Sequence, residues 1–383
     1  MWTIAGWYEE ARSSAAAKPE YYRRWGDHYL RCYDNWMPGV PGDEIVRRLR
    51  SWNSQRLQAM PDLAKYPELR GMRELIDAQW RGYRDGAGLR DDQWAAYCSG
   101  NSYYHRHIAT QIGEGSPVRG TPESGCSCIY FPRSDRGPLL AVNLDSSPDE
   151  PFGEPEWPLA NEHLIVAGVS SGIFLDEKSP EIFPAPVFGL VARYCRSTPE
   201  AVDMLARYNH FWGPGNLLVV DRSQKVAMIE KSACRYGIRH SPDGFGFVTA
   251  MTAEAPSMNA YLADRRAASL KARKLPAECA DTAYWRCADN RRKLMNELLD
   301  EARRTPTVEG LRGIIQFRDA QRGLVCYNGE RLTPDGPPCE FTLRTAVYLL
   351  AEGKARWWAR EGGKPSFENR KPDVTFNDVW LWE

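Results

Sequence analysis

The strongest constraint on the fold is a change in hydrophobic pattern near Cys126. Through 20–112, apolar residues recur three to four positions apart, which predicts amphipathic helices. From 126 to 145 the pattern changes to apolar runs on either side of a Ser-Asp-Arg-Gly turn, which predicts two strands joined as a hairpin. Between these regions lies 113–125, the clearest loop of the chain, which is rich in glycine and proline. We therefore expect a chain that combines helices with hairpins.

The rest of the chain repeats this mixture. We expect strands or strand pairs at 162–177, 216–232, 244–254 and 341–361, and helices at 188–208 and 260–320. Hairpins form antiparallel sheets, whereas parallel strands need long crossover connections between them. The pattern therefore favours a layered α+β sandwich over a doubly wound parallel sheet.

Composition excludes several classes of protein. The 50 basic and 50 acidic residues give a formal net charge of +0, so nothing indicates a nucleic-acid partner. No stretch approaches the roughly 18 consecutive apolar residues of a membrane span. The N-terminus carries acidic residues where a signal peptide has an apolar stretch, so we expect a soluble, cytoplasmic protein. Because glycine-rich nucleotide motifs and paired-cysteine zinc motifs are missing, we expect no metal and no bound organic cofactor.

Two of the ten cysteines, Cys126 and Cys128, are close together in the sequence. Both would lie on one face of a strand because side chains alternate along it, so two thiols packed in a core are one interpretation. A disulfide between them would close a strained ring. A metal site would need partners such as His163 or His240, and no spacing links these histidines to the pair. The remaining interpretation is that Cys126 is a nucleophile.

The glycine before Cys126 favours the nucleophile. Gly125 lets the backbone adopt strained angles at low steric cost. The cysteine sulfur can attack such a strained peptide bond, and hydrolysis of the resulting thioester then exposes a new N-terminal cysteine. Its α-amine would have a pKa of about 7.7–8.0, which suits a general base that acts on its own thiol. This chemistry needs no separate histidine.

The order of motifs resembles the cysteine N-terminal-nucleophile hydrolases, specifically the acyl-CoA:6-aminopenicillanic acid acyltransferase (penicillin acyltransferase) family and its cysteine peptidase-like relatives. The family junction Asp-Gly-Cys-Thr-Thr stands here at 124–128 as Ser-Gly-Cys-Ser-Cys. The family hairpin that ends in Asn-Trp-Asp ends here in Asn-Leu-Asp, at 143–145. Segments similar to later family motifs follow at 168–178, 197–208, 216–232 and 342–358.

The resemblance implies a four-layer αββα sandwich with a helical N-terminal segment. It also implies cleavage between Gly125 and Cys126 into a mostly helical α chain, 1–125, and a catalytic β chain, 126–383. The two chains would form one composite domain, an α/β heterodimer, which in turn could form a homo-oligomer. Cys126 would be the nucleophile, and Asp145 would hold the α-amine and the substrate. The pocket around them would be lined by Asn143, Cys128, Glu230, Ser232, Met251 and Thr252.

Two positions depart from the family pattern. The family's oxyanion-stabilising asparagine corresponds by spacing to Met251, whose thioether cannot donate a hydrogen bond. Losing one such donor typically costs a factor of about 10²–10³ in rate. Nearby threonines or backbone N–H groups are candidate replacements. The family's arginine falls on Cys339, and Arg331 and Arg344 are the candidates to supply its charge.

These features predict an autoproteolytically activated acyltransferase or amide (C–N) hydrolase that works through a thioester on Cys126. Its partners would be a small-molecule amide or acyl donor and an acyl acceptor, and acyl-CoA would be a substrate if the reaction is transfer. The alternative is a non-catalytic or rewired relative that binds a small apolar or aromatic ligand without cutting itself.

Overall fold

The computed structural model combines helices with antiparallel sheets, which confirms the predicted α+β class. The residues that it describes are 3–59, 71–100, 103, 126–146, 148–156, 158–170, 191, 194–207, 215–232, 235–250, 252–272, 286–330 and 341–376. The predicted loop at 113–125 lies outside these residues. Among the described helices, none has the length and apolar character that are needed to cross a membrane.

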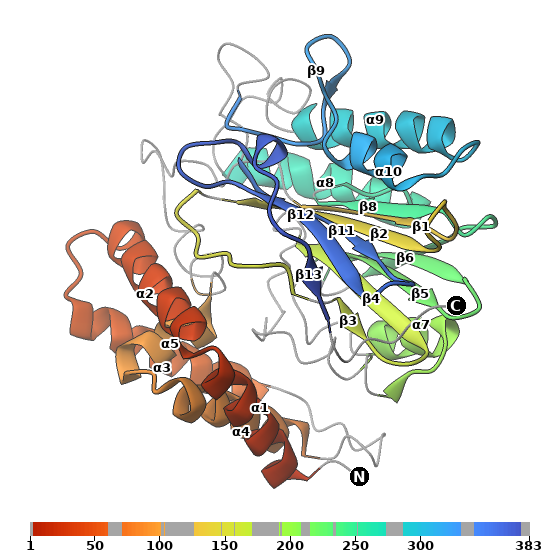
Figure 1. Cartoon of the computed structure of the whole chain (residues 1–383). Helices are drawn as coiled ribbons and strands as arrows, with labels where there is room; N and C mark the ends of the chain where they lie inside the picture. The colour runs from red at the N-terminus through yellow and green to blue at the C-terminus, as the bar shows by residue number, and fades with distance from the viewer. Residues whose placement is uncertain are drawn as a thin grey trace.

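The described part of the N-terminal segment is helical. Its helices are α1 (Ile4–Ala17), α2 (Pro19–Trp36), α3 (Gly42–Ala59), α4 (Met72–Ala87) and α5 (Asp91–Ser99). They lie together beside the sheets (Figure 1). The predicted helical pattern from residue 20 onward is confirmed in these ranges. The first helix begins earlier, because the Thr3 hydroxyl caps it by accepting a hydrogen bond from the Gly6 N–H at 3.0 Å.

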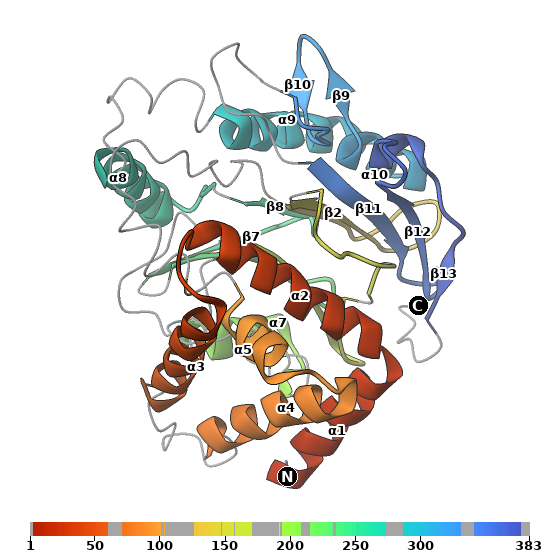
Figure 2. The ribbon, with the colours of Figure 1, turned by 90° about the vertical axis from the view of Figure 1, so that its left-hand side faces the viewer.

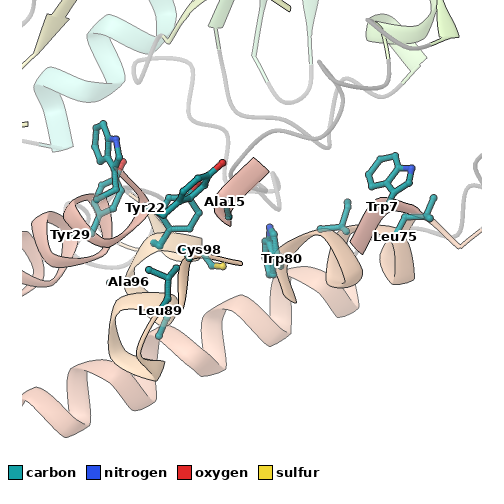
Figure 3. Close-up of a cluster of buried hydrophobic side chains, with 14 of the residues drawn as sticks. Trp7, Ala15, Tyr22, Tyr29, Leu75, Trp80, Leu89, Ala96 and Cys98 are labelled. Carbon is teal, nitrogen blue, oxygen red and sulfur yellow. The ribbon is translucent and has the colours of Figure 1, made fainter. Parts of the chain in front are cut away.

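Aromatic side chains form much of the core of this segment (Figure 3). The rings of Tyr22 and Tyr83 stack with centroids 5.3 Å apart, and those of Trp25 and Tyr29 stack at 5.4 Å. Such rings bury a large apolar area with few rotatable bonds. The same core includes Leu217 of a neighbouring sheet, so the helical segment shares its core with the rest of the molecule.

The first sheet has six antiparallel strands in the order β13-β12-β11-β2-β1-β8. These strands are β1 (Ser127–Phe131), β2 (Leu139–Ser146), β8 (Gly246–Thr249), β11 (Phe341–Leu349), β12 (Lys354–Ala359) and β13 (Val374–Thr375). The predicted hairpins at 126–145 and 341–361 are confirmed as β1–β2 and β11–β12. Strand β1, which follows Cys126, lies inside the sheet between β2 and β8.

The second sheet has five antiparallel strands in the order β3-β4-β5-β6-β7. These strands are β3 (Leu159–Ala160), β4 (Leu164–Ser170), β5 (Gly215–Asp221), β6 (Val226–Lys231) and β7 (Tyr236–His240). The predicted hairpin at 216–232 is confirmed as β5–β6. Of the strand pair predicted at 162–177, the first strand is β4 and the second lies outside the described residues. Strand β7 has only one buried residue, Gly237, so its sequence shows no clear alternation.

The remaining described elements are four helices, two short strands and one 3-10 helix. They are α7 (Thr198–Arg207), α8 (Pro256–Ala272), α9 (Arg286–Ala302), α10 (Val308–Ile315), β9 (Arg318–Asp319), β10 (Gly323–Leu324) and the 3-10 helix η6 (Ser366–Glu368). Helices α9 and α10 lie over the six-stranded sheet, and the N-terminal helices lie on the opposite side of the molecule (Figures 1 and 2). The helices predicted within 188–208 and 260–320 are confirmed where the structure describes them, except that the helical range ends at Ile315 and the short strand β9 follows it.

Alternation along the strands divides the apolar residues among three cores. In β1, Ile129 and Phe131 pack with α9 and α10, whereas Cys128 and Tyr130 pack against the second sheet. In β5, Leu218 and Val220 face the first sheet, whereas Leu217 and Val219 pack with α7 and the N-terminal helices. Each sheet therefore has two buried faces, and the layers follow the predicted order helix, sheet, sheet, helix.

A connecting segment, 148–156, joins β2 to the region before β3 and touches both the N-terminal helices and the first sheet. The Phe152 ring meets the Trp25 ring of α2 edge to face, with centroids 5.1 Å apart. The Arg344 guanidinium of β11 donates to the Gly153 carbonyl at 3.0 Å, and the Tyr348 hydroxyl donates to the Glu156 carbonyl at 2.7 Å. The connecting segment therefore links α2 to β11.

Glu150 makes this link sensitive to pH. Burial raises the pKa of Glu150 to about 7, although a hydrogen bond with Ser146 opposes the shift. Because the folded pKa is higher than the unfolded value of about 4.3, the stabilisation from the protonated carboxyl is complete below pH 4 and is lost as the pH rises to 7. Glu150→Gln should therefore raise the free energy of unfolding by about 1–3 kcal/mol at pH 8 and change it little at pH 4.

Urea denaturation at both pH values measures this difference. Glu162→Gln is the control, because it removes the same charge from a side chain that is 77% exposed. An equal effect of Glu150→Gln at both pH values would contradict the prediction.

Candidate active site

Cys126 lies directly before β1 and is partly buried. Its side chain packs at the margin of the core between the two sheets. Its sulfur lies 3.9 Å from the backbone carbonyl oxygen of Asp145. Its own carbonyl oxygen accepts a hydrogen bond from the Ala250 N–H at 3.0 Å, which holds the residue in line with β8. The candidate nucleophile is thus attached to a central strand and retains access to solvent.

Asp145 lies near the end of β2, the strand beside β1, and its side chain is fully buried. One carboxylate oxygen accepts a hydrogen bond from the Thr342 hydroxyl at 2.6 Å, and the other lies 2.9 Å from Nη2 of Arg291. Burial raises the pKa of Asp145, and Arg291 and Thr342 oppose this shift. The structure therefore brings the two predicted catalytic residues onto neighbouring strands, with the carboxylate oriented toward an arginine.

Arg291 is the site residue that sequence reasoning missed. It lies on α9, and its side chain is only 1% exposed. Its guanidinium stacks over the Tyr327 ring at 4.3 Å, and Nε donates to the Tyr327 hydroxyl at 3.3 Å. Nη1 lies 3.2 Å from the Ser127 hydroxyl and 3.5 Å from the Cys126 carbonyl oxygen. One cation therefore joins β1, β2 and α9.

The sequence does contain a signal for Arg291. Ala288, Leu294, Met295 and Leu298 form the buried face of α9, and Arg291 lies on that face by helical spacing. An arginine within an apolar stripe is a candidate for a buried ion pair, because a charge without a partner there would be costly. The position of Arg291 within the apolar stripe could not show that Asp145 would be its ion-pair partner.

Arg344, one of the arginines suggested by the sequence, has other contacts. Its Nη1 donates to the carbonyl oxygens of Gly153 and Glu154, at 3.0 and 2.8 Å. It therefore anchors the connecting segment, whereas Arg291 is the arginine beside Asp145. The other suggested arginine, Arg331, lies outside the described residues.

The end of β8 runs beside Cys126. The hydroxyls of Thr249 and Thr252 bond each other at 2.6 Å, and both residues are buried. Asn216 of β5 donates both amide hydrogens to this region, to the carbonyls of Thr249 at 2.7 Å and Thr252 at 2.8 Å. Asn216 thus joins the two sheets next to the candidate nucleophile. The two threonine hydroxyls face each other, and Met251 between them lies outside the described residues.

Glu230 and Ser232 have contacts that are typical of structural residues. One Glu230 oxygen accepts hydrogen bonds from the N–H groups of Glu254 and Ala255, both at 2.8 Å, just before α8. The other accepts from Nε of Arg239 at 2.8 Å. The Ser232 hydroxyl accepts a hydrogen bond from the Arg235 N–H at 3.0 Å in the turn between β6 and β7. The Glu230 carboxylate therefore fixes the start of α8.

Asn143 and Cys128 are buried on opposite faces of the first sheet. The Asn143 amide donates to the Ile315 carbonyl at 2.7 Å, and its oxygen accepts from the Thr345 hydroxyl at 2.7 Å. Cys128 is fully buried between the sheets, and burial raises the pKa of its thiol. Cys126 and Cys128 are both free thiols, so no disulfide joins them.

Two further predictions fall outside the part of the chain that the structure describes. These are the roles of Gly125 at the cleavage junction and of Cys339 at the family's arginine position. Within the described ranges, no group of three or more histidine, cysteine, aspartate or glutamate side chains could hold a metal ion.

No model of a known protein family matches the sequence, and no curated protein matches it. Among solved structures, a variant of conjugated bile acid hydrolase from Clostridium perfringens is similar, with a TM-score of 0.35 and 12% identity over 67% of this chain and 93% of that chain. Penicillin V acylase from Agrobacterium tumefaciens has a TM-score of 0.37 and 13% identity, over 63% of this chain and 84% of that chain. Similarity at this level carries no conclusion about the activity of this chain.

Proposed function

We propose that this chain is a cysteine N-terminal-nucleophile acyltransferase or amide hydrolase that activates itself by cutting the backbone between Gly125 and Cys126. The observation that carries the proposal is the setting of Cys126: a partly exposed thiol directly before a central strand, beside the buried Asp145–Arg291 pair. The sequence resemblance at 124–128 and 143–145 supports the same assignment.

Self-cleavage begins when the Cys126 sulfur attacks the carbonyl carbon of Gly125. The C–N bond breaks, the Cys126 nitrogen takes the proton of the thiol, and the acyl group remains on sulfur as a thioester. Water then adds to the thioester carbonyl, which releases the Gly125 carboxylate and regenerates the thiol. The products are two chains, 1–125 and 126–383, and the second begins with a free amine next to the nucleophile.

The mature site uses the same bond changes on a substrate. The α-amine of Cys126 takes the thiol proton, the thiolate attacks an acyl carbonyl, and the amine returns the proton to the leaving group. Water or an acceptor amine then removes the acyl group from the sulfur. The substrate is a small amide or an acyl donor such as an acyl-CoA, and the cycle needs no metal and no bound cofactor.

The two products of cleavage would stay together without a covalent link. The core of the N-terminal segment includes Trp25 and Tyr33 from α2 together with Leu164 and Leu217 from the second sheet. Separation would expose this apolar surface to water, which is unfavourable in proportion to its area. The active unit is therefore an α/β heterodimer.

Intact mass spectrometry of the purified protein under denaturing conditions tests the proposal directly. We expect two species whose masses add up to the full chain plus one water, with Cys126 at the start of the larger one. A single species of 43.5 kDa would contradict self-cleavage and would favour the ligand-binding alternative.

A further inference from the structure

A turn beside the candidate nucleophile is held by one amide group of the second sheet. Asn216 of β5 donates one amide hydrogen to the Thr249 carbonyl at 2.7 Å and the other to the Thr252 carbonyl at 2.8 Å. The residue opposite Asn216 on β6 is Glu230, and its carboxylate binds two N–H groups between the turn and α8. These two neighbouring side chains therefore fix the main chain of the turn and of the residues after it.

The turn lies at the end of β1 where the proposed reaction takes place. Ser127 pairs with Thr249 in the register of β1 and β8, and the Ala250 N–H donates to the Cys126 carbonyl at 3.0 Å. Because the two strands are antiparallel, the chain after Ala250 continues past the start of β1. An acyl carbonyl bonded to the Cys126 sulfur would lie at the same end of the strand.

The side chains of the turn have no proton left for an oxyanion. The Thr252 hydroxyl donates to the Thr249 carbonyl at 3.1 Å. The 2.6 Å contact between the two hydroxyls is therefore made with the proton of Thr249. A hydroxyl has only one proton to donate, and the thioether of Met251 has none. A donor from this turn must come from the main chain.

The N–H group of Ala253 is such a donor. Ala253 is only 3% exposed, and within the described part of the chain its N–H has no hydrogen-bond partner. Nearly all buried N–H groups in proteins are paired, because an unpaired one is unfavourable. An exception therefore calls for an explanation, and a catalytic role is one of the recognised ones.

The direction of this N–H is fixed by Asn216. The Ala253 N–H and the Thr252 carbonyl belong to one planar trans peptide, in which the two groups point in opposite directions. Since the carbonyl points to Asn216, the N–H points away from it. The peptide that precedes Ala250 is held in the same way, and there the N–H reaches the backbone of Cys126.

We infer that the Ala253 N–H is the oxyanion donor of the Cys126 site and that Asn216 is the positioning residue that orients it. The inference rests on the proposed function, because it names the group that stabilises the intermediates of that reaction. When the sulfur attacks, the C–S bond forms and the electron pair of the C=O double bond moves to oxygen. The Ala253 N–H donates to this oxygen until the C=O bond forms again and the C–N bond breaks. A donor that is already held in place needs no reorganisation during the reaction.

Replacing Ala253 with lactic acid tests the donor, because this exchange turns one N–H into an ester oxygen and keeps the methyl side chain. Cell-free synthesis with a suppressor tRNA that carries lactic acid yields the full chain, and a time course on denaturing gels follows self-cleavage. We expect cleavage to slow by a factor of about 10²–10³, the usual effect of losing one oxyanion donor. The urea midpoint, measured in the Cys126→Ala background so that every chain is uncut, should change little.

The matched control places lactic acid at Ala201 in α7. Ala201 is also buried, but its N–H donates to the Ser197 carbonyl at 3.0 Å. Losing this bond should lower the urea midpoint and leave the rate of cleavage unchanged. The two replacements are therefore expected to have opposite patterns. A purely structural role of Ala253 would instead give the pattern of Ala201.

Asn216→Leu tests the positioning role with an ordinary variant. It removes both hydrogen bonds to the turn and nearly conserves side-chain volume. In protein shown to be folded by circular dichroism, we expect cleavage to slow roughly tenfold or more, because the donor is no longer held. Combined with lactic acid at Ala253, Asn216→Leu should cause no further slowing, since the group that it orients is already gone.

Two results would overturn the inference. One is cleavage at the wild-type rate when lactic acid replaces Ala253. The other is a folded Asn216→Leu protein that cuts at the wild-type rate, or that slows the lactic-acid chain by the same factor as the wild type. An uncut wild-type chain would contradict the proposed function, and the inference would fall with it. A wild-type chain that cuts, together with either of the two results, would overturn the inference alone.

Discussion

Cys126→Ala is expected to yield one uncut chain that forms no thioester with any acyl donor, whereas Cys128→Ala is expected to leave both reactions intact. Only one residue, Ser127, separates these cysteines, but their environments differ. Cys126 is partly exposed before β1, whereas Cys128 is fully buried and its thiol has a raised pKa. A buried neutral thiol is a poor nucleophile. Of these two cysteines, Cys126 is therefore the one that can support the proposed chemistry.

Intact mass spectrometry measures both parts of this prediction. The number of polypeptide chains in the spectrum shows whether self-cleavage has occurred. A mass increase on the chain that contains Cys126 shows acylation by a thioester substrate. Cys128→Ala is the matched control, because it removes a thiol from the same strand and should cost only about 1 kcal/mol of stability. Cleavage that persists in Cys126→Ala would show that another group attacks the backbone. Loss of cleavage in a folded Cys128→Ala protein would show that the second thiol takes part.

Gly82→Ala is expected to lower the free energy of unfolding by about 2 kcal/mol, although alanine is the better helix former. Gly82 lies in the middle of α4, where α1 packs closely against it. A Cβ atom at this position would lie 2.4 Å from the Tyr8 carbonyl oxygen and 2.8 Å from the Ala11 Cβ. Backbone atoms cannot move aside as a flexible side chain can. The two helices would have to separate, with loss of packing between them.

Gly313→Ala is the matched control for this prediction. Gly313 also lies within a helix, α10, but a Cβ atom there would have no neighbour within 4 Å. Alanine should therefore raise stability by up to about 1 kcal/mol through its helix propensity alone. Chemical denaturation of both variants would show opposite signs for the same substitution. A gain in stability for Gly82→Ala would mean that α1 and α4 do not pack as closely as described.

The close packing of α1 on α4 has a visible basis in the sequence. Gly82 and Gly86 are four residues apart, as are Ala11 and Ala15, so each pair forms a small-residue stripe on one helix face. The stripes meet: a Cβ atom at Gly86 would lie 3.0 Å from the Ala15 Cβ. No local pattern indicated that these two helices, about 70 residues apart, would be partners.

The arrangement of the candidate site depends more strongly on tertiary structure. Asp145 was predicted because the Asn-Leu-Asp end of its hairpin resembles a family motif, and the structure puts it on the strand next to β1. Glu230 was predicted as a pocket residue, but its carboxylate binds the N–H groups before α8 and the Arg239 guanidinium. Arg291 was not predicted at all. Carboxylates and arginines are chemically suited to many partners, and only the fold decides which partner lies within hydrogen-bonding distance.

The sequence alone determined the class of elements, their order and their faces. Hydrophobic spacing and turn residues act over a few positions, so helices, hairpins and the alternation that puts Cys126 and Cys128 on one face can be predicted locally. Tertiary structure decided which strands are neighbours, that Cys128 is fully buried while Cys126 is only partly buried, and that Arg291 meets Asp145. The arginine and the aspartate, for example, are 146 positions apart along the chain. These pairings follow from how whole layers bury their apolar surface, which no local pattern encodes.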